Sequence, residues 1–194
     1  LPQCPASLVG AKHVVGSFRD KEAVLNFAKD CDVVTVEIEH IDCDALDELV
    51  AKGIDVQPTP KTLRTIQDKY AQKVHFQKNN VMIGPFMDIP NETQLQQAAN
   101  AFGFPLMLKS KRLAYDGKGN AVAKTEQDLA NAVKALGGYE TGLYAEKWVP
   151  FVQELAVMVA RSKTGEVVAY PVVETVHVDN ICDTTFAPAM ISNK

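Results

Sequence analysis

The chain has 194 residues, a formal net charge of −4 and 46% hydrophobic residues. This mildly acidic composition is typical of a globular protein and excludes a general electrostatic nucleic-acid binder. No apolar run approaches the roughly 18–20 residues that a membrane-spanning helix needs. We therefore expect neither a nucleic-acid partner nor a membrane partner.

The two ends and the cysteines set expectations about context. The sequence starts at Leu1 and stops at Lys194 without a closing element, so we expect a fragment that is cut at both ends. None of its cysteines has C-x-x-C spacing, which argues against a zinc site and favours reduced thiols in the cytosol. The four cysteines are Cys4, Cys31, Cys43 and Cys182.

Alternating strand and helix patterns over the first 58 residues predict part of a doubly wound α/β unit. The run over 33–38 is continuously β-branched and apolar until it reaches Glu37, which is typical of a buried parallel strand. The expected elements are a strand ending at Val14-Val15, a helix from Asp20 to Ala28 with Val24, Leu25 and Ala28 inward, a strand over 33–38, a helix with Leu46, Leu49 and Val50 inward that stops at Gly53, and a strand over 56–58.

The second part has a different pattern, with a boundary predicted between Pro58 and Pro60. Its strands are joined by turns as well as helices, which predicts an α+β arrangement with antiparallel strands. The expected elements are helices over 61–66 and 68–78, an extended segment at 84–86, a helix from Asn91 through Phe102, strands over 106–109 and 121–123, a helix over 127–136, a strand over 143–150, and a hairpin pairing 153–161 with 166–173.

A basic loop over Leu106–Asn120 is the strongest candidate for a ligand site. An apolar strand delivers Lys109 to its end, and two more cations and a pair of glycines follow. Glycine lets the backbone approach a ligand, and lysine neutralises phosphate charge, so the pattern suits a triphosphate. The alternative is an exposed hairpin with a solvated basic patch.

Three further stretches place polar groups at element ends. Glu37 and His40 follow a predicted parallel strand, at the edge where open α/β sheets bind ligands, although a solvated loop would look the same. The strand that breaks over 146–150 leaves backbone groups free to read the edge of adenine. Glu154 lies among apolar residues and suits the vicinal hydroxyls of a ribose; the alternative is a surface glutamate on an edge strand.

Together these motifs resemble a known family. The chain is similar to the carboxyaminoimidazole ribonucleotide synthetase family of the ATP-grasp superfamily, in the type found in fungal phosphoribosylaminoimidazole carboxylases. The motifs occur in the family's order over nearly the whole chain. They are Val34–His40, Gln67–Lys69, Leu108-Lys109, Ala114–Asn120, Glu146–Glu154, Met158–Arg161 and Tyr170–His177.

The resemblance implies a fold and a division of the chain. Residues 1–60 would be a partial pre-ATP-grasp, Rossmann-like domain with a doubly wound sheet. Residues 61–194 would hold the N-terminal lobes of an ATP-grasp domain that is incomplete at its C-terminal end.

The resemblance also implies an activity. ATP would phosphorylate bicarbonate to carboxyphosphate, and the amine of 5-aminoimidazole ribonucleotide would capture the carboxyl group, a step of purine biosynthesis in the cytoplasm. The Mg²⁺ ligands and the residues that hold bicarbonate would lie beyond residue 194, so no catalytic or metal-binding residue is assigned here. The isolated chain is expected to bind nucleotide weakly and not to turn over, and the complete protein is expected to be a homo-oligomer.

The family's binding residues carry over by position in the motifs. Lys69 and Lys109 would contact the ATP phosphates, and His177 would make a further nucleotide contact. The covering loop would be Ala114, Tyr115, Asp116, Gly117, Lys118, Gly119 and Asn120; the adenine-reading hinge would be Glu146, Lys147, Trp148 and Val149, with Glu154 on the ribose. The imidazole ribonucleotide would be held by Glu37, Tyr115, Asp116 and Lys118.

One departure from the family bears on the loop. Arg112-Leu113-Ala114 stands where the bacterial pattern has Thr-Gly-Gly, which predicts a stiffer start to the loop. Two other functions stay open on the sequence alone. One is another ATP-grasp ligase, such as a glycinamide ribonucleotide synthetase or a biotin carboxylase, and the other is a non-catalytic nucleotide-binding module.

Overall fold

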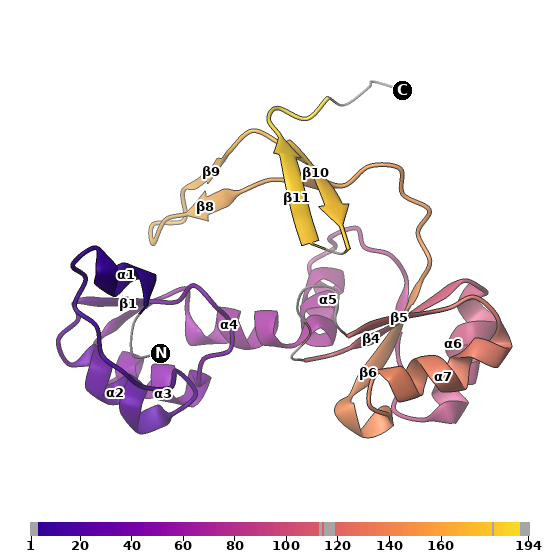
Figure 1. Cartoon of the computed structure of the whole chain (residues 1–194), viewed down its shortest axis with the longest axis horizontal. Coiled ribbons are helices and arrows are strands. Elements are labelled where there is room, and N and C mark those ends of the chain that lie inside the picture. The colour runs from indigo at the N-terminus through magenta and orange to yellow at the C-terminus, as the bar shows by residue number, and fades with distance from the viewer. Residues whose placement is uncertain (1–3, 113, 115–118, 180, 191–194) are drawn as a thin grey trace. The chain divides into compact units, whose positions relative to one another are not determined.

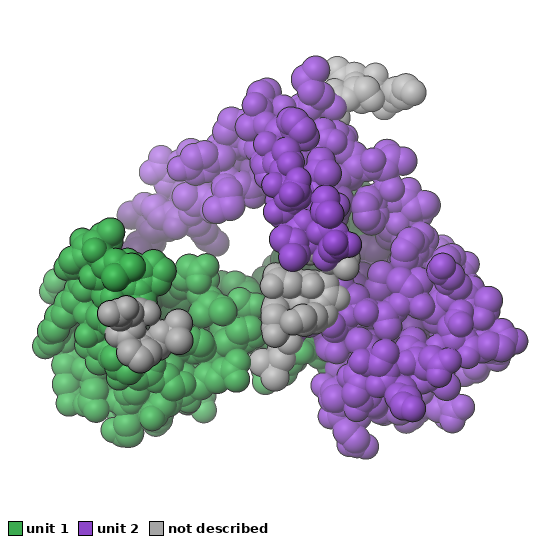
Figure 2. Space-filling view, in the orientation of Figure 1, with its two compact units in different colours: residues 1–83, 111–113 green, residues 84–110, 114–194 purple. Residues whose placement is uncertain are grey.

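The structure is a computed structural model that describes residues 4–112, 114, 119–179 and 181–190. The chain forms two compact units, coloured separately in Figure 2. Unit 1 comprises residues 1–83 and 111–113, and unit 2 comprises residues 84–110 and 114–194.

Unit 1 is built on a short parallel sheet of two strands, in which buried Val34 lies opposite buried Val56. Its core joins the sheet to three helices through residues such as Leu25, Leu46 and Leu63. The elements, in chain order, are α1 Pro5–Leu8, α2 Lys21–Ala28, β1 Val33–Thr35, α3 Cys43–Ala51, β2 Asp55–Gln57, α4 Pro60–Gln67 and α5 Lys69–Lys78.

Helix α2 begins at the expected place, with Asp20 as its N-cap. The Asp20 carboxylate accepts hydrogen bonds from the backbone N–H groups of Glu22 (3.0 Å) and Ala23 (3.3 Å), which satisfies donors that the first turn of α2 leaves open. The buried face of α2 is the predicted one. The prediction for α3 is wrong at Val50, which is 49% exposed while Leu49 is buried.

The strand predictions for unit 1 are confirmed in part. In the described part of the chain, no strand forms at Val14-Val15. Both side chains are exposed, and neither residue pairs with β1 or β2. Strand β1 stops at Thr35 instead of continuing to residue 38. Its partner β2 reaches Pro58 immediately after Gln57, and proline has no N–H with which to extend the ladder.

Unit 2 contains a four-stranded antiparallel sheet in the order β3-β6-β4-β5. Helices α6 and α7 lie against one face of it (Figure 1). The elements are β3 Phe86–Asp88, α6 Glu92–Phe102, β4 Leu106–Ser110, β5 Asn120–Ala123, the 3₁₀ turn η1 Glu126–Asp128, α7 Leu129–Ala135, the 3₁₀ turn η2 Tyr139–Thr141 and β6 Leu143–Lys147.

Side chains along β4 alternate between the two faces of the sheet. Leu106 and Leu108 are fully buried on the helix-covered face, so Met107 and Lys109 point to the opposite face. The buried cluster behind the sheet consists of Ile89, Leu95, Ala98, Ala99, Leu106, Leu108, Ala123, Leu129, Ala132, Val133, Leu136, Leu143 and Ala145.

The strands after residue 150 are arranged differently from the prediction. The expected hairpin forms only at its tip, where β8 pairs with β9, while β7 pairs with β10 in a second sheet of order β11-β10-β7. Among the described residues after position 150, none is buried. These strands are β7 Leu155–Ala156, β8 Val159–Arg161, β9 Val167–Ala169, β10 Val173–Val178 and β11 Ile181–Phe186.

The predicted combination of a parallel α/β part and an antiparallel α+β part is confirmed. Helix α4, which follows the predicted boundary at residue 60, contributes Leu63 to the core of unit 1. In the described part of the chain, no helix is long and apolar enough to cross a membrane.

Candidate functional site

Lys109 and Glu146 form a charged pair on the face of the unit 2 sheet that lies opposite helices α6 and α7. Strands β4 and β6 place Met107 opposite Glu146 and Lys109 opposite Tyr144, so Lys109 and Glu146 are diagonal neighbours. Lys109 Nζ lies 3.5 Å from Glu146 Oε2, and the two side chains are only 26% and 17% exposed. The packed sheet therefore holds a cation and a carboxylate side by side at a fixed position.

The basic loop is pinned at both of its ends. Lys109 pairs with Asn120, and the Ser110 N–H donates to the Gly119 carbonyl at 2.9 Å. Gly119 has φ +86, and a Cβ there would lie 2.5 Å from Cβ of buried Ala114, so only glycine fits. The predicted loop residues Tyr115, Asp116, Gly117 and Lys118 lie outside the described residues.

The predicted adenine hinge follows β6 directly. The Lys147 N–H donates to the Pro85 carbonyl at 3.0 Å, which is the last contact of this strand with the β3 side. Trp148 and Val149 are then exposed, and within the described residues their N–H groups donate no hydrogen bond. Open backbone donors beside an apolar side chain are what a planar base edge requires.

Glu154 and His177 contact each other directly. Glu154 Oε2 lies 2.8 Å from Nδ1 of His177, and the Glu154 carbonyl accepts a hydrogen bond from the Thr175 N–H at 3.0 Å. The β7–β10 pairing, with Leu155 opposite Glu174, brings these two segments together. Both side chains stay partly exposed, at 44% for Glu154 and 34% for His177, so a ligand can reach them.

Lys69 belongs to unit 1, where it is the first residue of α5. The Asp68 carboxylate caps this helix by accepting from the Ala71 N–H at 2.9 Å. The Lys69 N–H donates to the Lys111 carbonyl at 2.8 Å, so the start of α5 contacts the residues that follow β4.

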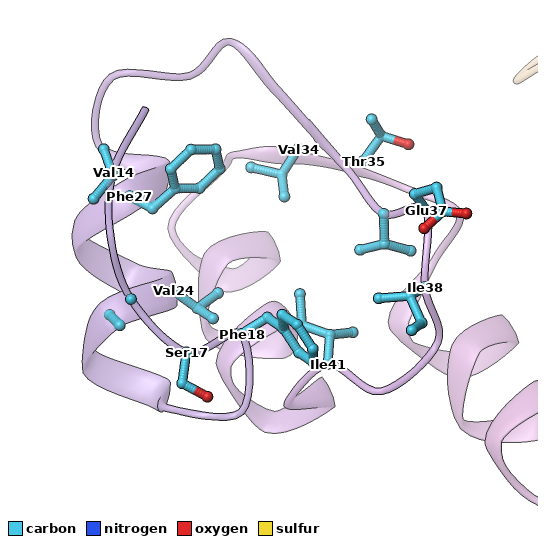
Figure 3. A pocket seen from close by; sticks show the side chains of 13 residues that line it. Val14, Ser17, Phe18, Val24, Phe27, Val34, Thr35, Glu37, Ile38 and Ile41 are labelled. Atoms are coloured by element: carbon cyan, nitrogen blue, oxygen red, sulfur yellow. The ribbon is translucent and has the colours of Figure 1, made fainter. Parts of the chain in front are cut away.

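Glu37 lines a cavity of about 260 Å³ in unit 1 (Figure 3). Its carboxylate lies beside Thr35 and Ile38 at the carboxyl end of β1, and Val14 and Phe27 lie at the far side. The rest of the lining is almost entirely apolar. The cavity thus offers one carboxylate at the rim of an apolar hollow, which suits a flat ring carrying an amine.

The structure brings the predicted residues together in two pairs, Lys109 with Glu146 and Glu154 with His177. Lys69 and Glu37 belong to unit 1. In the described part of the chain, no group of three or more His, Cys, Asp or Glu residues could hold a metal ion.

The sequence interpretation missed the contacts that Gln67 and Asp68 make with distant parts of the chain. The Gln67 amide donates to the carbonyls of Glu39 (2.6 Å) and Ile41 (2.8 Å), and so holds the segment that follows β1. Arg112 Nε lies 3.3 Å from Asp68 Oδ2. The motif Gln67–Lys69 indicates a function for its lysine only, because partners 26 to 44 residues away leave no local signal in the sequence.

Comparison with known proteins bears directly on this geometry. The family model for the ribonucleotide synthetase preATP-grasp domain matches residues 1–67, and the model for the ATP-grasp domain matches residues 74–194. A phosphoribosylaminoimidazole carboxylase of Ogataea methanolica is 47% identical over 98% of this chain and 36% of that protein. A chloroplastic phosphoribosylaminoimidazole carboxylase of Vigna aconitifolia is 48% identical over 98% of this chain and 34% of that protein.

Solved structures agree with these relatives. The carboxyaminoimidazole ribonucleotide synthase of Aspergillus clavatus, complexed with ATP, superposes with a TM-score of 0.89 at 43% identity over 97% of this chain and 50% of that one. The chain thus spans about a third of the length of the matching carboxylases and half of this structure. The chain belongs to the ATP-grasp family, in the group that contains the carboxyaminoimidazole ribonucleotide synthases and the phosphoribosylaminoimidazole carboxylases.

Proposed function

We propose that the complete protein uses ATP and bicarbonate to carboxylate 5-aminoimidazole ribonucleotide in purine biosynthesis, and that this chain supplies much of its nucleotide site. The observation that carries the proposal is the Lys109–Glu146 pair beside a pinned glycine loop. A related structure from Aspergillus clavatus contains ADP and 5-aminoimidazole ribonucleotide, at 41% identity and a TM-score of 0.87.

The residues divide the work of holding ATP. Lys109, and Lys69 from unit 1, would neutralise phosphate charge, while the loop from Ala114 to Asn120 would cover the phosphates. The open N–H groups of Trp148 and Val149 would read the adenine edge, and Glu154 would accept the ribose hydroxyls with His177 beside it. Positioning and charge neutralisation are the main contributions a protein makes to phosphoryl transfer.

The second substrate would be held from unit 1 and the covering loop. Glu37 would accept hydrogen bonds from the imidazole ribonucleotide at the rim of its cavity. Tyr115, Asp116 and Lys118 would complete this contact from the loop.

Several features of the complete protein remain proposals. Mg²⁺ would neutralise the charge of the ATP phosphates when bound, and its ligands would lie outside this chain. The proposed division is a pre-ATP-grasp domain over 1–60 and an ATP-grasp domain over 61–194. The order of the two domains is supported by the family matches to residues 1–67 and 74–194. We also propose a homo-oligomer in the cytoplasm that binds neither nucleic acid nor membrane, although one relative is named as chloroplastic.

The proposal is tested by ADP release from the complete protein with each acceptor supplied in turn. We expect turnover that requires both bicarbonate and 5-aminoimidazole ribonucleotide. Lys109→Ala should lower kcat/KM by roughly 100-fold, since removing charge-assisted contacts to phosphate costs about 1.5–3 kcal/mol. Lys163→Ala, in the turn between β8 and β9, is the matched control and should leave turnover unchanged.

Other outcomes would contradict the proposal. Turnover with glycinamide ribonucleotide or biotin as the acceptor would assign the protein to another ATP-grasp ligase. Nucleotide binding that neither Lys109→Ala nor Glu154→Ala alters would leave the loop without a ligand role.

A further inference from the structure

The junction between helices α4 and α5 holds two loops at once through consecutive residues. Gln67 donates from its amide to the carbonyls of Glu39 and Ile41, at 2.6 and 2.8 Å. Asp68, the next residue, pairs with Arg112 at 3.3 Å. Gln67 therefore contacts the segment after β1, and Asp68 contacts the start of the basic loop.

The contact with the basic loop has three parts. Besides the Asp68–Arg112 pair, the Lys69 N–H donates to the Lys111 carbonyl at 2.8 Å. The Lys111 ammonium also lies 4.9 Å from the centre of the Tyr70 ring, a cation–π geometry. These contacts fix both the backbone and the side chains of the two residues that follow strand β4.

Asp68 does two things with its two carboxylate oxygens. Oδ1 accepts from the Ala71 N–H and caps α5, while Oδ2 faces Arg112. The helix start that carries Lys69 is therefore defined by the same side chain that holds the loop. A change at Oδ2 that preserves the cap would release the loop without unwinding the helix.

We propose that Gln67 and Asp68 are positioning residues that set the two substrate loops separately: Gln67 the loop of Glu37, and Asp68 the start of the nucleotide loop. The inference rests on the proposed function, because it assigns the two loops to two substrates. Neither residue touches substrate in this scheme. Gln67 acts through the backbone of Glu39 and Ile41, and Asp68 acts through Arg112.

The scheme predicts a split between the two Michaelis constants. Gln67→Met keeps the side-chain size but removes both donated hydrogen bonds, and it should raise KM for 5-aminoimidazole ribonucleotide about tenfold with little change in KM for ATP. Asp68→Asn keeps the helix cap and removes the charge, and it should raise KM for ATP about two- to fivefold.

Arg112→Gln tests the same pair from its exposed end, where the side chain is 59% exposed. It should match Asp68→Asn, and the double variant should be no worse than either single one because they remove a single interaction. Arg19→Gln is the control. Arg19 lines the same cavity of about 310 Å³ as Arg112, so its substitution removes a similar charge from the same cavity. Asp68 is not among the residues that line this cavity.

The measurements use steady-state kinetics of the complete protein, with thermal unfolding of each variant alongside. Equal changes of both KM values in Gln67→Met and Asp68→Asn, or a drop in unfolding temperature that accounts for them, would overturn the inference. So would an effect of Arg19→Gln as large as that of Arg112→Gln. If the wild-type protein shows no turnover that depends on both substrates, the proposed function itself fails; an active wild type with unaffected variants refutes only this inference.

Discussion

The two halves of the proposed nucleotide site are supported very differently within unit 2. Lys109 and Glu146 lie on a sheet whose other face is sealed by α6 and α7, with Leu106, Leu108 and Ala145 fully buried. Glu154, just before β7, and His177, on β10, lie in a region where none of the described residues is buried. One pair is positioned by a hydrophobic core, and the other by a short ladder and by each other.

The difference shows that the type of a residue decides its chemistry, whereas the packing around the residue decides how firmly its side chain is positioned. A packed core fixes a side chain to within a rotamer, because neighbouring atoms leave no alternative. A strand without a core fixes only its backbone register. We therefore expect variants of the buried side chains in the first region to act through stability, and variants of the partly exposed pair in the second region to act through ligand contacts.

The largest effect should come from the packed region. Leu108→Ala removes a fully buried side chain from β4 and should destabilise the protein by about 2–5 kcal/mol, since it deletes buried methyl groups and leaves a cavity. Val168→Ala, at a 58% exposed position in β9, should change stability by less than about 0.5 kcal/mol. Urea unfolding of both variants measures this, and equal midpoints would remove the distinction between the two regions.

A substitution in the region after residue 150 should change the affinity for ATP more than it changes stability. Glu154→Gln leaves the fold intact and should raise KM for ATP by about tenfold or more, because a hydrogen bond to a charged group contributes about 1.5–3 kcal/mol. The control is Glu166→Gln, at an exposed position beside the β8–β9 turn. A loss of thermal stability without a change in KM would show that the Glu154–His177 contact is structural.

A pair of glycines compares the two regions at the level of the backbone. Gly119 and Gly165 both have positive φ, but an added Cβ would meet Ala114 at Gly119 and open space at Gly165. Each alanine variant should cost about 1–2 kcal/mol for the backbone conformation alone. Only Gly119→Ala should also raise KM for ATP, and an equal rise in Gly165→Ala would contradict the assignment of the loop.

Two cysteines provide the mildest comparison. Burial raises the pKa of the Cys43 thiol in the packed core of unit 1, so less of it is thiolate at a given pH. Cys182, on β11, is exposed. A thiol reagent at pH 8 should therefore modify Cys182 first and Cys43 only after unfolding, as peptide mass spectrometry can show. Equal rates would mean that the core around Cys43 opens readily.

The sequence predicted elements whose cause is local. The helix that starts after Asp20, the helix that starts at Asn91 and the strand that carries Lys109 depend on near neighbours, and these three elements are confirmed. Near neighbours do not predict that β7 pairs with β10 while β8 pairs with β9. Strands β9 and β10 are both rich in valine, so the sequence does not distinguish them as partners for β7. The pairing of Asp68 with Arg112 depends on how the chain returns, for which no periodicity exists.

The site was predicted to the same extent. Residue type and order placed Lys109, Glu146, Glu154 and His177 as candidates, but the direct contacts within each pair became visible only in three dimensions. The roles of Gln67 and Asp68 escaped notice because each acts on distant backbone or side chains.

The neighbour of Lys109 also has a consequence for selectivity. Since its ammonium already faces a carboxylate at 3.5 Å, an incoming anion must compete with that carboxylate for the same charge. Chloride or bicarbonate has a single negative charge, so its attraction to Lys109 would be no stronger than that of the carboxylate. A polyphosphate carries several negative charges and would attract Lys109 more strongly than the carboxylate does. The pre-existing contact would thus reject the abundant small anions of the cell, and added chloride at constant ionic strength should leave nucleotide affinity almost unchanged.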